Sequence, residues 1–281
     1  MSSDGTPPAG EEHGAIPPGS EDEHATFDTS VAHIARVYDY WLGGKDNYEA
    51  DRKAGDAVIQ AYPDTVASVR ANRAFLARVV RHMTSAAGIR QFLDIGTGIP
   101  TANNTHEVAQ SLAPRSRVVY VDNDPIVLAH ARALLTTGPQ GATDYIDADL
   151  RDTEKILEQA ARTLDFSRPV AVMLIAILHL IGDDEGPHQI VAKLLDAVPP
   201  GSYLALSHVA SDIEPEQVAE LRSRHNRLMH QKLTPRSLAQ VARFFDGLEM
   251  IEPGVVRVQE WRPDAATEGV STLWGGLGRK R

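Results

Sequence analysis

Cysteine is absent from this chain of 281 residues. Its absence excludes disulfide bonds, thiolate nucleophiles and cysteine-ligated zinc or iron–sulfur sites. No His-Glu-x-x-His motif or other dense spacing of metal ligands occurs either, and His225 and His230 are spaced too poorly to share a helix face. We therefore expect a fold that is held together by packing, and a site that contains no metal ion.

Long apolar runs and clusters of basic residues are also missing. The longest apolar stretch, 170–181, is shorter than the roughly 20 residues of a membrane helix, and the N-terminus has no signal-peptide pattern. The net charge is −10, but seven acidic residues and no Lys or Arg lie within the first 28 residues, so the remainder carries only about −3. A nearly neutral body favours neither nucleic acid nor membrane as partner. We expect a cytoplasmic protein; its oligomeric state stays open.

The first 30 residues differ in composition from the rest of the chain. They contain four prolines, four glycines and few apolar side chains, so burial cannot offset the entropy lost on ordering them. The sequence predicts a disordered acidic tail over residues 1–30, an N-terminal helical cap or lid over 31–88, and an α/β domain over 89–281.

Three helices are expected before the first strand. Apolar residues spaced by three and four predict a helix from Val31 to Leu42, which Gly43 and Gly44 end. A second helix is predicted over 46–60. A third begins at Pro63, because proline suits the first turn of a helix, and ends before Gly88.

Strands and helices then alternate along the chain. This order is typical of an α/β fold with a mostly parallel sheet and helices on both faces. Two extended segments close the chain and predict a final hairpin, which brings the sheet to seven strands. The predicted strands are 91–95, 118–121, 144–146, 170–175, 203–207, 248–251 and 271–274, with a looser extended stretch at 255–258. The predicted helices are 105–112, 125–135, 153–161, 185–197, 215–230 and 235–244.

The segment 92–98, Phe-Leu-Asp-Ile-Gly-Thr-Gly, is an apolar strand followed by an acid and two glycines. Glycines at this point allow a ligand to approach the backbone closely. An NAD fingerprint needs a third glycine, and Thr101 stands in its place. The carboxylate of Asp94 would repel a pyrophosphate, but it can pair with an ammonium group directly or through water. The segment thus favours an ammonium-bearing ligand, and a tight turn without a ligand is the alternative.

Two further acids follow the next strands. Asp122 lies 24 residues after Gly98, where an acid accepts hydrogen bonds from a ribose diol. Asp149 follows the third strand and can accept from an adenine amino group while Leu150 packs on the ring. Asp124 and Asp152 are interpreted as helix caps instead. Since carboxyl ends of parallel strands meet at one edge, these loops are expected to share one crevice.

These three loops resemble the first three motifs of the Rossmann-like methyltransferases. The stretches 35–48 (ARVYDYWLGGKDNY) and 98–106 (GIPTANNTH) are more specifically similar to an actinobacterial family, first catalogued as a domain of unknown function and described as S-adenosylmethionine-dependent methyltransferases. The resemblance covers about residue 30 to the end. It implies a Rossmann-like methyltransferase fold, S-adenosyl-L-methionine as cofactor in the domain over 89–281, and an unidentified small molecule as methyl acceptor.

The N-terminal block allows two interpretations. Tyr38, Trp41 and Tyr48 flank the Gly-Gly turn and predict either a lid over the cofactor or helices docked on the sheet, with Trp41 in the core. Arg70, Asn72 and Arg73 on the third helix can reach a ligand carboxylate, with a solvated helix face as the alternative for the two cations. The residues predicted to contact the cofactor are Tyr38, Gly43, Gly44, Asp94, Gly96, Thr97, Gly98, Asp122, Asn123, Asp149, Leu150 and Ala176.

A general base is sought after the fourth strand, in the segment 176–183 (AILHLIGD). The Asn/Asp-Pro-Pro-aromatic motif of base and amide methylation is absent, and the segment resembles the Leu-His loop of small-molecule methyltransferases. His179 is the catalytic candidate, because an unperturbed imidazole titrates near working pH. A structural role for His179 is the alternative, and His208 is a second candidate. Methyl transfer can also proceed by alignment and desolvation without a base.

A second class of function stays open. The same motifs would serve a regulatory or interaction protein that binds S-adenosylmethionine without catalysis. The two functions differ in whether an acceptor pocket adjoins the reactive sulfonium. An NAD-dependent oxidoreductase would need the missing third glycine, and methylation of nucleic acid would call for a basic face.

Overall fold

The computed structural model describes residues 28–134, 138, 140–264 and 271–281, so the predicted tail lies almost wholly outside them. Three helices precede the first strand, as predicted: α1 (Ile34–Trp41), α2 (Glu49–Ala61) and α3 (Thr65–Ser85). The later helices are α4 (Thr105–Leu112), α5 (Pro125–Leu134), α6 (Thr153–Ala160), α7 (Pro187–Asp196), α8 (Pro215–Leu228) and α9 (Leu238–Ala242). Nowhere in this described part of the chain is a helix both long and apolar enough to cross a membrane.

The described residues form a mixed sheet of eight strands in the order β3-β2-β1-β4-β5-β8-β6, with β7 beside β8. The first five strands in this order are parallel, and β8 joins β5 antiparallel. The strands are β1 (Gln91–Ile95), β2 (Arg117–Asp122), β3 (Ala142–Asp147), β4 (Ala171–Ile175), β5 (Tyr203–Val209), β6 (Leu248–Met250), β7 (Val256–Arg257) and β8 (Leu273–Lys280). The α/β prediction is confirmed, but the sheet has one strand more than predicted, because the loose stretch at 255–258 supplies β7.

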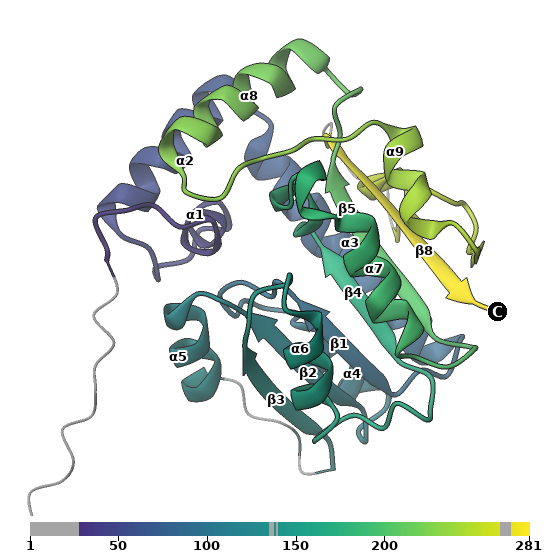
Figure 1. The fold of residues 1–281 in the computed structure, drawn as a ribbon. Helices are drawn as coiled ribbons and strands as arrows, with labels where there is room; N and C mark the ends of the chain where they lie inside the picture. The colour runs from purple at the N-terminus through teal and green to yellow at the C-terminus, as the bar shows by residue number, and fades with distance from the viewer. Residues whose placement is uncertain (1–27, 135–137, 139, 265–270) are drawn as a thin grey trace, which may run out of the picture.

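Alternation along each strand sends side chains to two separate cores (Figure 1). On β1, Leu93 and Ile95 pack on the face that α6 and α7 cover, whereas Phe92 packs on the opposite face with α3 and α4. Because successive side chains point to opposite faces, Asp94 shares the face of Phe92. This alternation places the carboxylate of Asp94 on the face covered by α4, at the carboxyl end of the strand and beside the start of that helix.

The final strand was predicted wrongly. The sequence predicts a strand over 271–274, whereas β8 continues to Lys280 and its end, not its start, pairs with β6. Gly275 and Gly278 look like strand breakers in the sequence. In the structure, a Cβ at Gly275 would lie 2.8 Å from Val258, and one at Gly278 would lie 2.9 Å from Phe245. These glycines therefore serve close packing across the strand.

Five predicted helices begin two or three residues later than expected: α1, α2, α3, α7 and α9. The helix predicted over 235–244 begins at Leu238, because the backbone amide of Arg236 donates to the carbonyl of Val209 in an extended bridge. The helix predicted over 185–197 begins at Pro187, after Gly186 adopts a left-handed conformation with φ 68°. Short 3-10 turns, at Leu178–Leu180 (η1), Asp183–Glu185 (η2), Arg243–Phe245 (η3) and Val258–Glu260 (η4), occupy neighbouring segments.

Helices α1, α2 and α8 lie together beyond the carboxyl ends of the parallel strands (Figure 1). They share an apolar cluster that includes Val37, Trp41 and Val58. Trp41 is buried, as predicted, and its indole nitrogen donates to the carbonyl of Gly55 across 3.2 Å. Helix α3 instead packs on the sheet through Phe75 and Val79. The predicted cap over 31–88 thus contains two helices above the strand ends and one helix on the sheet.

Candidate cofactor site

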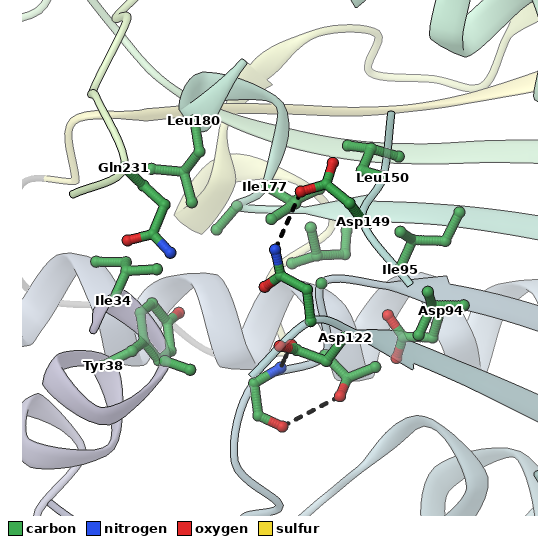
Figure 2. Close-up of a pocket in the computed structure, with 18 of the residues that line it drawn as sticks. Ile34, Tyr38, Asp94, Ile95, Asp122, Asp149, Leu150, Ile177, Leu180 and Gln231 are labelled. Carbon is green, nitrogen blue, oxygen red and sulfur yellow. Dashed lines mark hydrogen bonds between the residues drawn. The ribbon is translucent and has the colours of Figure 1, made fainter. Parts of the chain in front are cut away.

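A cavity lies at the carboxyl ends of β1, β2, β3 and β4, beneath α1 (Figure 2). Together with the open space at its mouth, it holds about 970 Å³. The structure brings most of the predicted cofactor residues together here, whereas Gly43 and Gly44 do not line the cavity. Those that line it are Tyr38, Asp94, Gly96, Thr97, Gly98, Asp122, Asn123, Asp149, Leu150 and Ala176.

The glycine loop after β1 is held against β2 by hydrogen bonds from its backbone amides. Gly96 has φ 75° and Gly98 has φ 65°, conformations that favour glycine. The amides of Gly96 and Thr97 donate to the carbonyl of Val121, across 2.8 and 3.3 Å, and the amide of Gly98 donates to Oδ2 of Asp122 across 2.9 Å. These amides are therefore engaged within the protein and do not form the cradle of donors that a pyrophosphate requires.

Asp122 ends β2 as a buried carboxylate that faces the cavity. One oxygen accepts from the amide of Gly98 and the other from the amide of Asp124, across 3.0 Å. Each carboxylate oxygen has a further lone pair, so two hydroxyl donors of a ribose can still be accepted. Burial raises the pKa of Asp122 because it disfavours the charged form. Hydrogen bonds donated by a ligand would stabilise that charged form.

Asp124 caps α5, as predicted, and also binds the N-terminal block. Its Oδ1 accepts from the amide of Ile126 across 2.9 Å, and its Oδ2 lies 2.7 Å from Nδ1 of His33. Burial alone would raise the pKa of Asp124, but the hydrogen bond and charge of His33 hold it below its ordinary value. His33 precedes α1 and lines the cavity, so this contact joins the first helix to the ribose side of the site.

Asp94 is a buried carboxylate at the end of β1. Thr105, the first residue of α4, donates from Oγ1 to Oδ2 of Asp94 across 2.6 Å. Burial raises the pKa of Asp94 to about 6, against the opposing effects of Thr105 and Arg73. A buried acid with so little compensation gains from a cation within the cavity. The positive end of α4 faces this carboxylate and offsets part of the cost of its charge.

Asp149 and Leu150 follow β3 at the next part of the wall. Asp149 accepts from Nδ2 of Asn123 across 3.1 Å and from the guanidinium of Arg151 across 2.9 Å. Burial would raise the pKa of Asp149, but the hydrogen bonds from Arg151 lower it below its ordinary value. Leu150 is buried in the core beneath the cavity. Asp152 caps α6 by accepting from Lys155, as predicted.

Four polar groups form a chain along one wall of the cavity. The amide of Ala176, which has an unusual φ of 56°, donates to Oγ of Ser207 across 3.0 Å. Ser207 donates to Oδ1 of the buried Asn72 across 2.6 Å, and Nδ2 of Asn72 donates to the hydroxyl of Tyr38 across 3.0 Å. Burial raises the pKa of Tyr38. The chain holds a neutral phenol in place at the cavity, and Ser207 is a member that the sequence analysis did not name.

The Gly-Gly turn after α1 has a structural role instead of a place in the cavity lining. Gly43 has φ 82° and closes the helix, and Gly44 packs so closely against the Asp39 carboxylate that a Cβ would clash. Asp39 accepts from the amide of Asp46 across 3.0 Å and from Nδ2 of Asn47 across 2.8 Å. The conspicuous GGKDN sequence therefore builds a loop around a buried acid.

His179 and His208 lie beside this site but do not line the cavity. Both are buried, and their rings meet edge to face. Burial lowers the pKa of His208 to about 3 and that of His179 well below its ordinary value. Arg236, also buried, donates to Nε2 of His208 across 2.9 Å and to the carbonyls of Leu178 and Ile181 across 3.1 and 2.8 Å. The histidines thus share a structural cluster that supports the loop after β4.

Further lining residues were not among those predicted to contact the cofactor. They include His33 and Ile34 at the start of α1, Ile177 and Leu180 after β4, and Gln231 in the loop after α8. Asn72 and Arg73 line the cavity as well, as predicted, whereas Arg70 of the same helix is exposed and does not line it. The described residues contain no cluster of three or more His, Asp or Glu side chains that could hold a metal ion.

The strand order, the glycine loop bonded to β2 and the acids at three strand ends define a Rossmann-like methyltransferase fold. Over residues 20–281, the chain matches the sequence model of the family described as S-adenosyl methyltransferase, and it belongs to that family. The family resemblance predicted from the sequence is thereby confirmed. The cofactor of this family is S-adenosylmethionine.

Two solved structures are similar over nearly their whole length. A DUF574 family protein from Streptomyces avermitilis is 47% identical, with 90% of this chain and 99% of that chain covered and a TM-score of 0.88. A protein from Thermobifida fusca, described as a candidate methyltransferase, is 42% identical, with 93% and 100% covered and a TM-score of 0.85. No curated protein sequence matches this chain.

The residues present fit S-adenosylmethionine better than a dinucleotide. Asp122 would offer carboxylate oxygens to a ribose diol, and Asp94 would offer a buried carboxylate, of raised pKa, to an ammonium group. The loop amides that a pyrophosphate would need already donate to β2. The donor and acceptor groups of the cavity therefore match a zwitterionic amino acid joined to a nucleoside.

Proposed function

We propose that this chain transfers the methyl group of S-adenosylmethionine to a small molecule within the cavity. The observation that carries the proposal is the convergence of three acidic strand ends on a single cavity whose other side is apolar (Figure 2). The acidic side matches the cofactor, and the apolar side leaves a place for an acceptor. A regulatory protein that only binds the cofactor would not require this second side.

Five side chains would hold the cofactor. Asp122 would accept from the ribose hydroxyls, and Asp149 from the adenine amino group above Leu150. Asp94 would pair with the ammonium group, while the guanidinium of Arg73, which also lines the cavity, would face the carboxylate. When bound, the cofactor supplies an electrophilic methyl group on a sulfonium with a neutral leaving group.

The chain contributes alignment and exclusion of water to this reaction. The hydrogen bonds from Asn72 and to Val69 fix Tyr38 against the cavity, and α1 covers the strand ends. Holding donor and acceptor in line supplies much of the rate of such a displacement. His179, predicted as a candidate base, lies behind the cavity wall, so the proposal requires no proton transfer to it.

We infer that α1 and α2 act as the cap predicted for residues 31–88. Support comes from four cavity-lining residues at and just before α1: His33, Ile34, Ala35 and Tyr38. Arg36 lies 3.3 Å from the fully buried Asp51 of α2, which also accepts from the backbone amide of His33 across 2.9 Å. These contacts make α1 and α2 one unit over the cofactor side.

Calorimetric titration with S-adenosylmethionine, S-adenosylhomocysteine and NAD tests the proposal. The wild type is compared with Asp122→Asn and with Asp147→Asn, a matched change of an exposed acid at the end of the neighbouring strand. We expect both adenosyl ligands to bind, NAD not to bind, and Asp122→Asn to weaken binding by about 10- to 100-fold through lost charged hydrogen bonds. Absence of binding by both adenosyl ligands, or equal weakening by the two variants, would contradict the proposal.

A further inference from the structure

A second pocket lies at the opposite end of the sheet from the proposed cofactor site. It is formed where β1, β4 and β5 begin and where β8 ends, beside the C-terminus in Figure 1. Together with the open space at its mouth, it holds about 550 Å³. The charged residues that line it are Arg90, Arg168 and Arg279. The pocket is therefore cationic, although the chain as a whole carries a net charge of −10.

The sheet brings these residues together. Tyr203, the first residue of β5, also lines the pocket and pairs with Ala171 of β4 on one side and with Arg279 of β8 on the other. Tyr203 and Ala171 belong to the apolar cluster between the sheet and α3. Because directly opposed residues of neighbouring strands place their side chains on one face, Arg279 lies on this face as well. Arg90 directly precedes β1, and Arg168 lies in the loop that leads into β4.

The three arginines have few acidic partners. The guanidinium of Arg168 forms no hydrogen bond or ion pair within the part of the chain that the structure describes. Arg90 donates only from Nη1, to two backbone carbonyls across 2.8 and 2.9 Å. Nη1 of Arg279 lies 3.9 Å from the exposed carboxylate of Glu249. Neither Glu249 nor Asp165, three residues before Arg168, lines the pocket. The donors of the pocket are thus largely open to an anion.

Tyr203 adds a donor without charge. The residue is only 7% exposed, and its hydroxyl makes no hydrogen bond to any residue that the structure describes. A hydroxyl withdrawn from water without a partner is costly, so a ligand that accepts a hydrogen bond from it would be stabilised. Guanidinium groups are donors only. The pocket therefore suits a ligand group that carries negative charge and only acceptors.

We propose that this pocket binds the phosphate group of a small phosphate monoester. Three terminal oxygens and a charge near −2 allow such a group to accept from several guanidiniums at once. A carboxylate, with one charge and two oxygens, would leave more of these donors unused. Ala87, Ile89 and Pro169 also line the pocket and would contact the organic part of the ester. The inference does not depend on the proposed function, because the two sites share no lining residue.

Three aromatic anions test the inference on the full chain by calorimetry at pH 8 and low ionic strength. Phenyl phosphate is a dianion at this pH, because the second pKa of a phosphate monoester is about 6. Phenyl sulfate has three terminal oxygens but one charge, and benzoate has two oxygens and one charge. We expect phenyl phosphate to bind with a Kd of about 1 mM or tighter, and the other two to bind about fivefold or more weakly. Equal affinities of the three, or no binding of phenyl phosphate, would overturn the inference.

Variants of the lining residues locate the binding. Arg168→Gln combined with Arg279→Gln should weaken phenyl phosphate binding by about tenfold or more, and Tyr203→Phe should weaken it by about threefold or more. The matched control combines Arg222→Gln with Arg227→Gln, which removes the same charge from exposed positions on α8. Its affinity should stay within twofold of the wild type. Equal weakening by the two double variants would show attraction by net charge alone and would overturn the inference.

The cofactor cavity is tested separately with Arg73→Gln. Arg73 lines that cavity and not the second pocket, so this variant should bind phenyl phosphate within twofold of the wild type. A loss of tenfold or more in Arg73→Gln would place the anion in the cofactor cavity and overturn the inference. Urea denaturation shows which variants fold, and Arg168→Gln alone replaces the double variant in the same comparison if the latter does not.

Discussion

The two sides of the cavity are built in different ways. The side that we propose for the cofactor, called the cofactor side, consists of residues that directly end or follow β1, β2 and β3, so backbone pairing in the sheet sets their positions. The side that we propose for the acceptor, called the acceptor side, brings together the start of α1, the turn after β4 and the loop after α8. There the contact between His33 and Gln231 joins residues 198 positions apart. The cofactor side thus depends on the sheet, whereas the acceptor side depends on side-chain contacts between distant segments.

The largest effect should come from removing the support of the acceptor side. Arg236→Leu deletes a buried guanidinium that donates to His208, to the carbonyls of Leu178 and Ile181, and to Asp183 across 2.7 Å. Leaving these acceptors unpaired should lower the free energy of unfolding by about 3 kcal/mol or more, as measured by urea denaturation. The exposed Arg222→Leu is the control. A loss below about 0.5 kcal/mol, the range of ordinary surface changes, would show that the loop after β4 stands without Arg236.

Asp94→Asn should separate function from stability on the cofactor side. The asparagine keeps an acceptor for Thr105 but removes a buried charge whose pKa is raised to about 6. This shift corresponds to roughly 1–3 kcal/mol, so the free energy of unfolding at pH 7 should rise by about that amount. Affinity for S-adenosylmethionine should fall by about tenfold or more, since the ammonium loses its partner. A variant that is less stable, or that binds as tightly as the wild type, contradicts this role of Asp94.

The same carboxyl predicts a pH dependence. Burial raises the pKa of Asp94 in the folded state, so the folded protein binds this proton more tightly than the unfolded chain does. The destabilisation by Asp94 is therefore full above about pH 6 and is relieved as the pH falls toward about 4. Cofactor affinity should move the other way and weaken between pH 7 and 5, because the ammonium requires the ionised form. Calorimetric titrations at several pH values should show that cofactor affinity depends less on pH in Asp94→Asn than in the wild type. An equal pH dependence in the two proteins would mean that other groups, such as Asp122, cause it.

The smallest effect is expected at the histidines behind the wall. Burial lowers the pKa values of His179 and His208, so both rings should stay neutral between pH 8 and 5. Nitrogen-15 NMR of the imidazoles can follow each ring, with the exposed His230 as reference. Titration of His179 near neutral pH would contradict its place in the structural cluster and would support the base predicted from the sequence.

Local patterns predicted much of the fold and the cofactor side. Alternating strands and helices gave the parallel part of the sheet, and acids that directly follow strands could be placed at its carboxyl edge. The prediction failed where tertiary packing reverses a local preference. Gly275 and Gly278 interrupt a strand pattern, yet neighbouring side chains require them inside β8.

Motif reasoning was less informative for the acceptor side. The Gly43-Gly44 sequence is conspicuous, but it serves the loop around Asp39 instead of lining the cavity. Gln231 has no local pattern to mark it, because its place in the cavity lining depends on contacts with distant segments such as His33. Residues of this kind can be predicted only once the contacts between distant segments are known.

A crystal structure of the complex with S-adenosylhomocysteine tests the central claim most directly. The account predicts that the ribose hydroxyls lie within hydrogen-bond distance of Asp122, that the amino group faces Asp94, and that the sulfur is directed toward the side formed by Tyr38, Leu180 and Gln231. A nucleoside bound against Gln231, with the carboxylate of Asp122 free of the ligand, would contradict the assignment of the two sides.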